Sequence, residues 1–263
     1  MPVRRSDPLD TRQLLDEAYA RFARPDFITD DPVQVPRSFT DVRDAELIGL
    51  LTATIAWGQR RTILTNAWRL VRMMDGEPHA FIMGASETEV RAMDRFVHRT
   101  FQGVDLCYFV AALRHLVNTH GGLEAAFLTG TEGHWDAAQG IHLFRERFFQ
   151  LPHPERTRKH VADPAKGSNA KRLNMFLRWM VRPDDRGVDM GHWRRIRPAD
   201  LMVPLDVHTG RVARDLGLLQ RRQDDWKSVI ELTEQLRKLD PVDPVRYDIA
   251  LFALDVAASA PTA

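Results

Sequence analysis

Apolar residues recur at helical spacing along almost the whole chain. In residues 62–74, the apolar positions 63, 67, 70 and 74 lie on one side of a helix. Residues 45–57 are almost wholly apolar, which predicts a buried central helix. The same reasoning predicts helices at residues 14–22, 45–57, 62–74, 87–93, 106–117, 123–128, 135–149, 170–181, 207–218, 225–239 and 244–256. Because no segment has the alternation or the turn residues of a β-hairpin, the pattern predicts an all-α fold of many short helices.

The length of the chain and one loop-like segment indicate how the chain is divided into domains. Its 263 residues are enough for one or two domains. Residues 151–167 are rich in proline, histidine and basic side chains, and we predict a loop there. We therefore expect one helical unit over residues 1–263, built of two lobes with a cleft between them. A lobe boundary, if there is one, is expected near residues 151–166.

Composition restricts the class of protein. Hydrophobic residues at 44% and charged residues at 28% are ordinary for a soluble globular chain. No apolar run reaches the roughly 20 residues that span a bilayer, and the N-terminal residues contain no apolar signal core. We expect a bacterial cytoplasmic protein without membrane contact. Cys107 is the single cysteine, which excludes an internal disulfide and a four-cysteine metal site from this chain.

Basic residues are concentrated in one segment, although the net charge of the chain is only +1. Residues 156–182 hold eight Lys and Arg side chains against one acidic residue, Asp163. Such a concentration is typical of a phosphate-binding surface. It is equally consistent with a solvated basic face beside the acidic Asp184, Asp185 and Asp189.

The sequence KGSNAKRLNMFLRWMVR, residues 166–182, predicts a tight turn followed by a helix. Gly167 and Asn169 both tolerate the positive φ that such a turn requires. The apolar positions 173, 176, 177, 180 and 181 share one helical face. The opposite face, which we expect to be exposed, carries Lys171, Asn174, Arg178 and Arg182. A helix N-terminus flanked by cations binds phosphate well, and a lysine beside other cations is a candidate nucleophile.

The sequence PLDVHTGRVARDLGLL, residues 204–219, places an aspartate directly before an amphipathic helix. Asp206 is therefore predicted to cap this helix, since its carboxylate can accept hydrogen bonds from free backbone N–H groups. A catalytic carboxylate at the same place is the alternative. His208 is expected to brace the helix.

These segments together resemble the helix-hairpin-helix DNA glycosylases of the endonuclease III and archaeal 8-oxoguanine glycosylase type. KRLNMFLRW resembles their lysine helix and LDVHTGRVARDLGLL their aspartate helix, so that Lys171 and Asp206 match the catalytic positions. LIGLLTATIAWGQRRT, from Leu47, resembles the buried helix whose following loop inserts into the DNA, and DPVRYDIALFALDV resembles the helix that closes the helical barrel. The chain as a whole also resembles a bacterial family known as domain of unknown function 2400.

Three features depart from the glycosylase pattern. The turn contains Lys166, Gly167, Ser168 and Asn169 where Pro-Gly-x-Gly is usual. The lysine and the aspartate are unusually far apart in sequence, which implies an insertion carrying PDDRGVDMGHW. The chain also lacks the cysteines that hold the iron–sulfur cluster of endonuclease III.

The resemblance implies a mechanism. The damaged nucleotide is flipped out of the duplex, and a side chain fills the gap. Lys171 attacks C1′, expels the base and forms a Schiff base that permits strand cleavage, so that the protein is a glycosylase with AP lyase activity. Asp206 stabilises positive charge on the sugar or deprotonates the lysine, while Asn174 and His208 support the pair. Gln59 is the expected wedge, ahead of Trp57 and Arg60. The residues expected to contact DNA are Gln59, Arg60, Arg158, Lys159, Lys166, Gly167, Ser168, Asn169, Arg172, Arg178 and Arg211.

We expect no cofactor, neither an iron–sulfur cluster nor zinc, because His153, His160, Asp206 and His208 lack the close spacing of zinc ligands. DNA is the expected partner, with RNA as the alternative, and a monomer is the expected state. Three alternative hypotheses for the function are a non-catalytic helix-hairpin-helix nucleic-acid-binding protein, an RNA-processing enzyme on the same scaffold, and a helical protein that binds an acidic partner.

Overall fold

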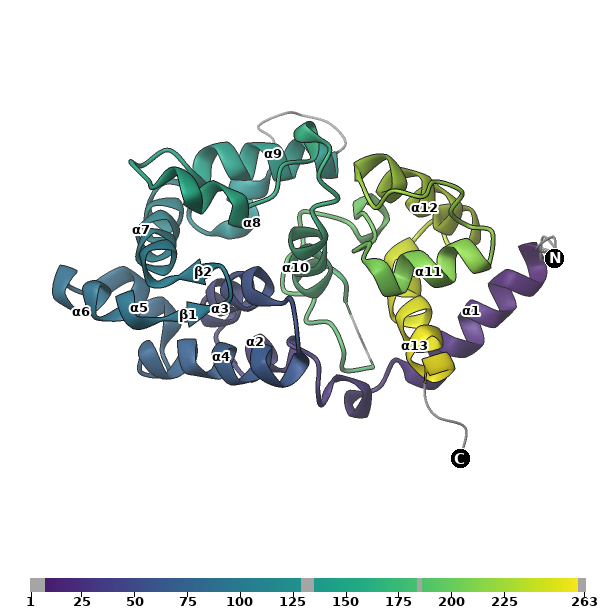
Figure 1. The fold of residues 1–263 in the computed structure, drawn as a ribbon, viewed down its shortest axis with the longest axis horizontal. Coiled ribbons are helices and arrows are strands. Elements are labelled where there is room, and N and C mark those ends of the chain that lie inside the picture. The colour runs from purple at the N-terminus through teal and green to yellow at the C-terminus, as the bar shows by residue number, and fades with distance from the viewer. Residues whose placement is uncertain (1–7, 129–134, 184–185, 260–263) are drawn as a thin grey trace. The chain divides into compact units, whose positions relative to one another are not determined.

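The computed structural model describes residues 8–128, 135–183 and 186–259, and these are mostly helical (Figure 1). The chain forms two compact units. One, here called the middle unit, is Ile28–Ala165; the other, the terminal unit, joins Met1–Phe27 to Lys166–Ala263. The chain passes from the middle unit to the terminal unit between Ala165 and Lys166, at the end of the range 151–166 in which we expected a lobe boundary. The chain also passes from the terminal unit to the middle unit after Phe27, and the sequence analysis did not predict a boundary there.

The middle unit is built around one buried helix. Its helices are α2 (Gln34–Arg37), α3 (Val42–Ile55), α4 (Arg60–Met73), α5 (Pro78–Gly84), α6 (Glu87–Ala92), α7 (Gly103–His120), α8 (Leu123–Phe127) and α9 (Ala137–Phe148). Every residue of α3 from Ala45 to Ile55 is buried, as the apolar run predicts, and α2, α4 and α5 pack against this helix. A second, aromatic part of the core joins α7 to α9, where Phe109 and Phe148 meet edge to face.

The mostly helical chain confirms the all-α prediction, but a short hairpin in the middle unit, for which the sequence analysis found no signal, is an exception. Strand β1 (Val97–His98) pairs antiparallel with β2 (Phe101–Gln102), with His98 opposite Phe101. The turn contains Arg99 in the left-handed region, with φ 55°. Hairpin turns usually place Gly or Asn there, so the sequence has no recognisable signal.

The terminal unit packs two helices against α13 (Tyr247–Ser259). These are α1 (Pro8–Phe22) and α11 (Val207–Asp215), and the unit is completed by α10 (Lys171–Val181) and α12 (Trp226–Leu239). The structure also contains short 3₁₀ helices. They are Pro25–Ile28, Met93–Arg95, Glu155–His160, Pro164–Lys166, Pro198–Asp200 and Pro244–Arg246.

The expected exposure of one face of α10 is wrong. All of Leu173–Val181 is buried, including Asn174 and Arg178, and so is Arg182. The cause is the polypeptide after the helix, which folds back over it. The backbone N–H of Met190 donates to the carbonyl oxygen of Trp179 at 2.8 Å, and that of Trp193 donates to Met180 at 2.7 Å. The described part of the insertion thus covers α10, whereas Asp184 and Asp185 lie outside the described residues.

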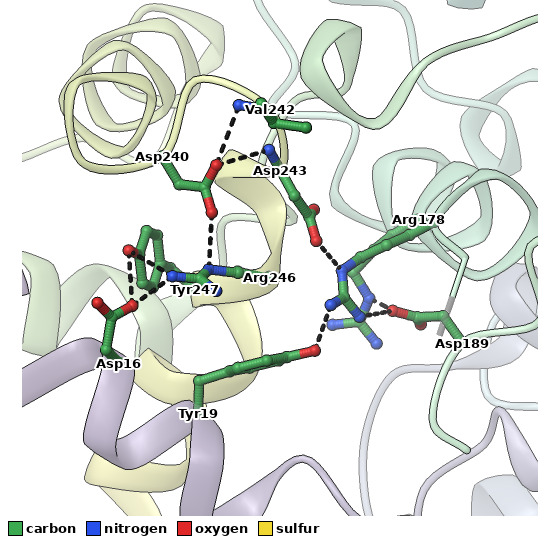
Figure 2. Close-up of polar contacts among 10 residues, drawn as sticks. Asp16, Tyr19, Arg178, Asp189, Asp240, Val242, Asp243, Arg246 and Tyr247 are labelled. Atoms are coloured by element: carbon green, nitrogen blue, oxygen red, sulfur yellow. Dashed lines mark hydrogen bonds and ion pairs between the residues drawn. The ribbon is translucent and has the colours of Figure 1, made fainter. Parts of the chain in front are cut away.

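The basic residues on this face are neutralised inside the protein. Asp189 accepts from Arg178 Nε at 3.2 Å and from Arg182 Nη1 at 3.0 Å. Asp243 accepts from Arg182 Nε at 2.7 Å, and Tyr19 of α1 contacts the same guanidinium (Figure 2). Burial lowers the pKa of Arg182, but the negative charges of Asp189 and Asp243 raise it by a larger amount. The pKa of Arg182 therefore lies well above the usual value for arginine. This buried arginine cluster comprises Tyr19, Arg178, Arg182, Asp189, Asp243 and Asp248.

Candidate functional site

A tight turn in the terminal unit leads into α10. Gly167 adopts φ +83°, as its residue type predicts. The second left-handed residue is Ala170, with φ 47°, and not Asn169 as expected from its type. The turn is held in place by α12, since the backbone N–H of Trp226 donates to the carbonyl oxygen of Gly167 at 3.0 Å. Lys166 and Gly167 remain exposed, and Ser168 and Asn169 are half-buried.

Asn169 connects the turn to the segment that precedes α11. Its side-chain Nδ2 donates to the carbonyl oxygen of Leu205 at 3.1 Å, and its Oδ1 accepts from the backbone N–H of Lys171 at 3.3 Å. Asn174 secures the turn from within α10, because its Nδ2 donates to the carbonyl oxygen of Asn169 at 3.1 Å. The first residue of α10 is thereby fixed beside the start of α11.

Lys171 and Asp206 meet at this junction. Lys171 Nζ lies 3.6 Å from Asp206 Oδ2, and the two side chains are 26% and 28% exposed. Asp206 also caps α11, as predicted, since its Oδ1 accepts from the backbone N–H groups of His208 at 3.0 Å and Thr209 at 3.1 Å. One carboxylate oxygen therefore serves the helix while the other faces the amine, so that capping and pairing with the lysine do not exclude each other.

A second carboxylate lies beneath the pair and was not found from the sequence. Asp248 of α13 accepts from Thr209 Oγ1 at 3.3 Å and forms an ion pair with Arg178. Burial raises the pKa of Asp248 to about 6, with the charge of Asp206 acting in the same direction and that of Arg178 against it. The usable signal was an aspartate in a mainly apolar helix, in which Asp248 and Asp255 are the charged residues.

Asp255, about two turns after Asp248 along α13, orients His208. His208 Nδ1 lies 2.8 Å from Asp255 Oδ2, and Arg211 contacts the same carboxylate through Nε at 2.7 Å and Nη2 at 2.6 Å. Burial raises the pKa of Asp255, but the hydrogen bonds from Arg211 and His208 outweigh it and lower the pKa below the usual range. An ionised carboxylate only accepts hydrogen bonds, so Nδ1 carries the imidazole proton. His208 thus braces α11 against α13.

The remaining predicted DNA contacts have different surroundings. In the terminal unit Arg178 is 6% exposed and belongs to the buried arginine cluster, so it is removed from the set of surface contacts. Arg172 is half-buried, and burial lowers its pKa. In the middle unit Gln59 and Arg60 are exposed at the start of α4, Lys159 is exposed, and Arg158 contacts Glu155 and His153.

Asp248 provides a test of the electrostatics below the site. Its pKa is raised from 3.8 to about 6, so the folded protein binds this proton more tightly than the unfolded chain. The resulting stabilisation is complete below pH 3.8 and is lost as the pH rises through about 6. The shift corresponds to roughly 3 kcal/mol. The unfolding free energy of Asp248→Asn minus that of the wild type is therefore expected to increase by up to about 3 kcal/mol when the pH is raised from about 4 to about 7. Urea unfolding at both pH values measures this, and a difference independent of pH would contradict it.

Two general features of the described residues bear on function. Among them, no three His, Cys, Asp or Glu side chains are grouped so that they could hold a metal ion. No helix within the described ranges is both long enough and apolar enough to cross a lipid bilayer.

Comparisons with known proteins give one match. Neither the curated proteins nor the solved structures include a match to this chain. A family model described as "Protein of unknown function (DUF2400)" matches residues 31–257, which include α10, α11 and almost all of α13. Since this match covers most of the chain, the protein belongs to the DUF2400 family.

Proposed function

We propose that the protein is a DNA glycosylase with AP lyase activity, in which Lys171 is the nucleophile and Asp206 its catalytic partner. The observation that carries the proposal is the 3.6 Å separation of Lys171 Nζ and Asp206 Oδ2, between residues far apart in sequence. Both side chains are partly exposed, so a substrate can reach them. The exposed turn at Lys166 and Gly167 adjoins the lysine and supplies backbone N–H groups for a DNA phosphate.

The proposed reaction starts with a proton transfer. Lys171 must lose a proton before it can attack, and the Asp206 carboxylate is close enough to accept it. The amine then bonds to C1′ of the flipped nucleotide, and the base departs with the electrons of the glycosidic bond. Opening of the sugar ring gives a Schiff base between Lys171 and C1′. Loss of a proton from C2′ expels the 3′ phosphate, and water finally releases the lysine.

The same proposal includes the setting of the reaction. The substrate is duplex DNA with a damaged base, with RNA as the alternative, and the protein works as a monomer in the bacterial cytoplasm. The proposed steps use side chains alone and require no cofactor. A non-catalytic nucleic-acid-binding role is retained as the alternative because an ammonium group held by a carboxylate is also a simple ion pair.

Trapping of the Schiff base tests the proposal. The protein is incubated with duplex DNA that contains one abasic site, then treated with borohydride, and the products are separated on a denaturing gel. We expect a covalent complex with the wild type, and an adduct that forms about 10² to 10⁴ times more slowly with Asp206→Asn. Salt-dependent binding without an adduct would favour the non-catalytic alternative. No binding even at low salt would contradict both and favour a protein-binding role.

A further inference from the structure

A groove of about 740 Å³ lies on the middle unit, between α4 and the segment before α2. Its volume falls in the range of small-molecule sites. One side is the outer face of α4, where Arg61, Leu64, Trp68 and Arg72 occur at helical spacing. The opposite side includes Asp30. Apart from Arg60, the residues that line the groove are not among those assigned to DNA binding or catalysis at the Lys171 site.

The groove is cationic, and two of its arginines, Arg61 and Arg72, are not paired within the described part of the chain. Arg60, Arg61 and Arg72 line it against one acidic residue, Asp30. Within the described residues, neither Arg61 nor Arg72 forms an ion pair or a side-chain hydrogen bond, whereas Arg178 and Arg182 are neutralised internally. Arg60 and Arg61 also occupy the first turn of α4, where the helix dipole adds positive potential. An anionic ligand is therefore favoured.

The groove also offers a flat aromatic surface. Trp68 is half-buried on the exposed face of α4, with Leu64 one turn before it. An indole ring at the surface between arginines provides a stacking platform for a base, while Asp30 can accept a hydrogen bond from an amino or hydroxyl group. At 1.5 Å per residue, Arg61 and Arg72 begin about 16 Å apart along the helix with Trp68 between them. Phosphate recognition and base stacking are thus combined in one groove.

We propose that this α4 groove binds a phosphorylated nucleoside, with the Trp68 ring on the base and a flanking arginine on the phosphate. The ligand is either a free nucleotide or one unit of a single strand, since both present the same chemistry. The proposal does not depend on catalysis by Lys171, and its residues belong to the other unit.

The experiment measures binding and location together. Fluorescence anisotropy follows the full-length protein with a labelled thymidine octamer, and unlabelled AMP is added as a competitor. We expect Trp68→Leu to weaken octamer binding about 5- to 150-fold without changing the salt dependence. Arg61→Gln/Arg72→Gln is expected to weaken it and to reduce the slope of log affinity against log salt by about 1.4. Arg91→Gln, an exposed arginine of α6 in the same unit, is the matched control and should leave the affinity unchanged.

A photo-crosslink identifies the groove directly. An octamer with one 5-iodouracil should crosslink to the peptide that contains Trp68. Competition by AMP with the same dependence on Trp68 would assign a free nucleotide, and its failure would assign a strand. Equal binding by wild type and Trp68→Leu, a crosslink elsewhere in the chain, or no binding by either ligand at low salt would overturn the proposal. Thermal unfolding of each variant checks that the fold is retained.

Discussion

Lys171→Gln is expected to give no borohydride-trapped adduct with abasic-site DNA and to lose strand cleavage by at least about 100-fold. Glutamine is one bond shorter than lysine and keeps a hydrogen-bond donor, but it has no nucleophilic nitrogen. The ion pair that is lost is partly exposed, so its removal should change the unfolding free energy by no more than about 1 kcal/mol. Loss of the adduct would therefore report chemistry and not unfolding.

The matched control is Lys238→Gln on α12, an exposed lysine of the same unit whose ammonium group donates a hydrogen bond to Gln235. This variant should form the adduct at the wild-type rate. Digestion of the wild-type adduct and mass spectrometry should place the modification on Lys171. An adduct of undiminished yield in Lys171→Gln, or one that maps to the exposed Lys166, would show that the nucleophile is misassigned.

Asp189→Ala is expected to lower the unfolding free energy by about 3–5 kcal/mol, the cost of removing one partner from a buried ion pair. Asp189 is 1% exposed and accepts from both Arg178 and Arg182, so the substitution leaves two buried guanidinium groups with one carboxylate each. Figure 2 shows how Asp189 faces these guanidinium groups. Asp189→Asn should cost less, because the amide keeps one acceptor oxygen.

Urea unfolding monitored by circular dichroism measures both variants. Glu234→Ala provides the comparison in the same unit, since its pair with Arg237 spans 2.6 Å but the glutamate side chain is 54% exposed. Exposed pairs contribute about 0–1 kcal/mol, so this variant should unfold close to the wild type. An Asp189→Ala midpoint equal to that of Glu234→Ala would mean that water reaches the buried arginine cluster.

The sequence predicted those features that depend on local periodicity. The apolar run of α3 and the capping role of Asp206 are confirmed because each follows from residues close together in the chain. The exposure of Arg178 was predicted wrongly because its partners, Asp189 and Asp248, come from the segment after α10 and from α13, and local periodicity does not show such contacts. Asp248 and Asp255 were missed for a related reason: their partners lie on other helices. The left-handed Ala170 is fixed by its surroundings against the preference of its residue type.

The partnership of α1 with α13 has a consequence for biosynthesis. These two helices pack together, yet more than two hundred residues separate them in the chain. At roughly 5–20 residues per second, a ribosome needs about 10 to 45 s to make that intervening chain. Tyr19 is synthesised before its later partners Arg182, Arg186 and Arg246. Helix α1 must therefore wait until α13 has been synthesised, so a chaperone that holds early chain segments should increase the yield of native protein.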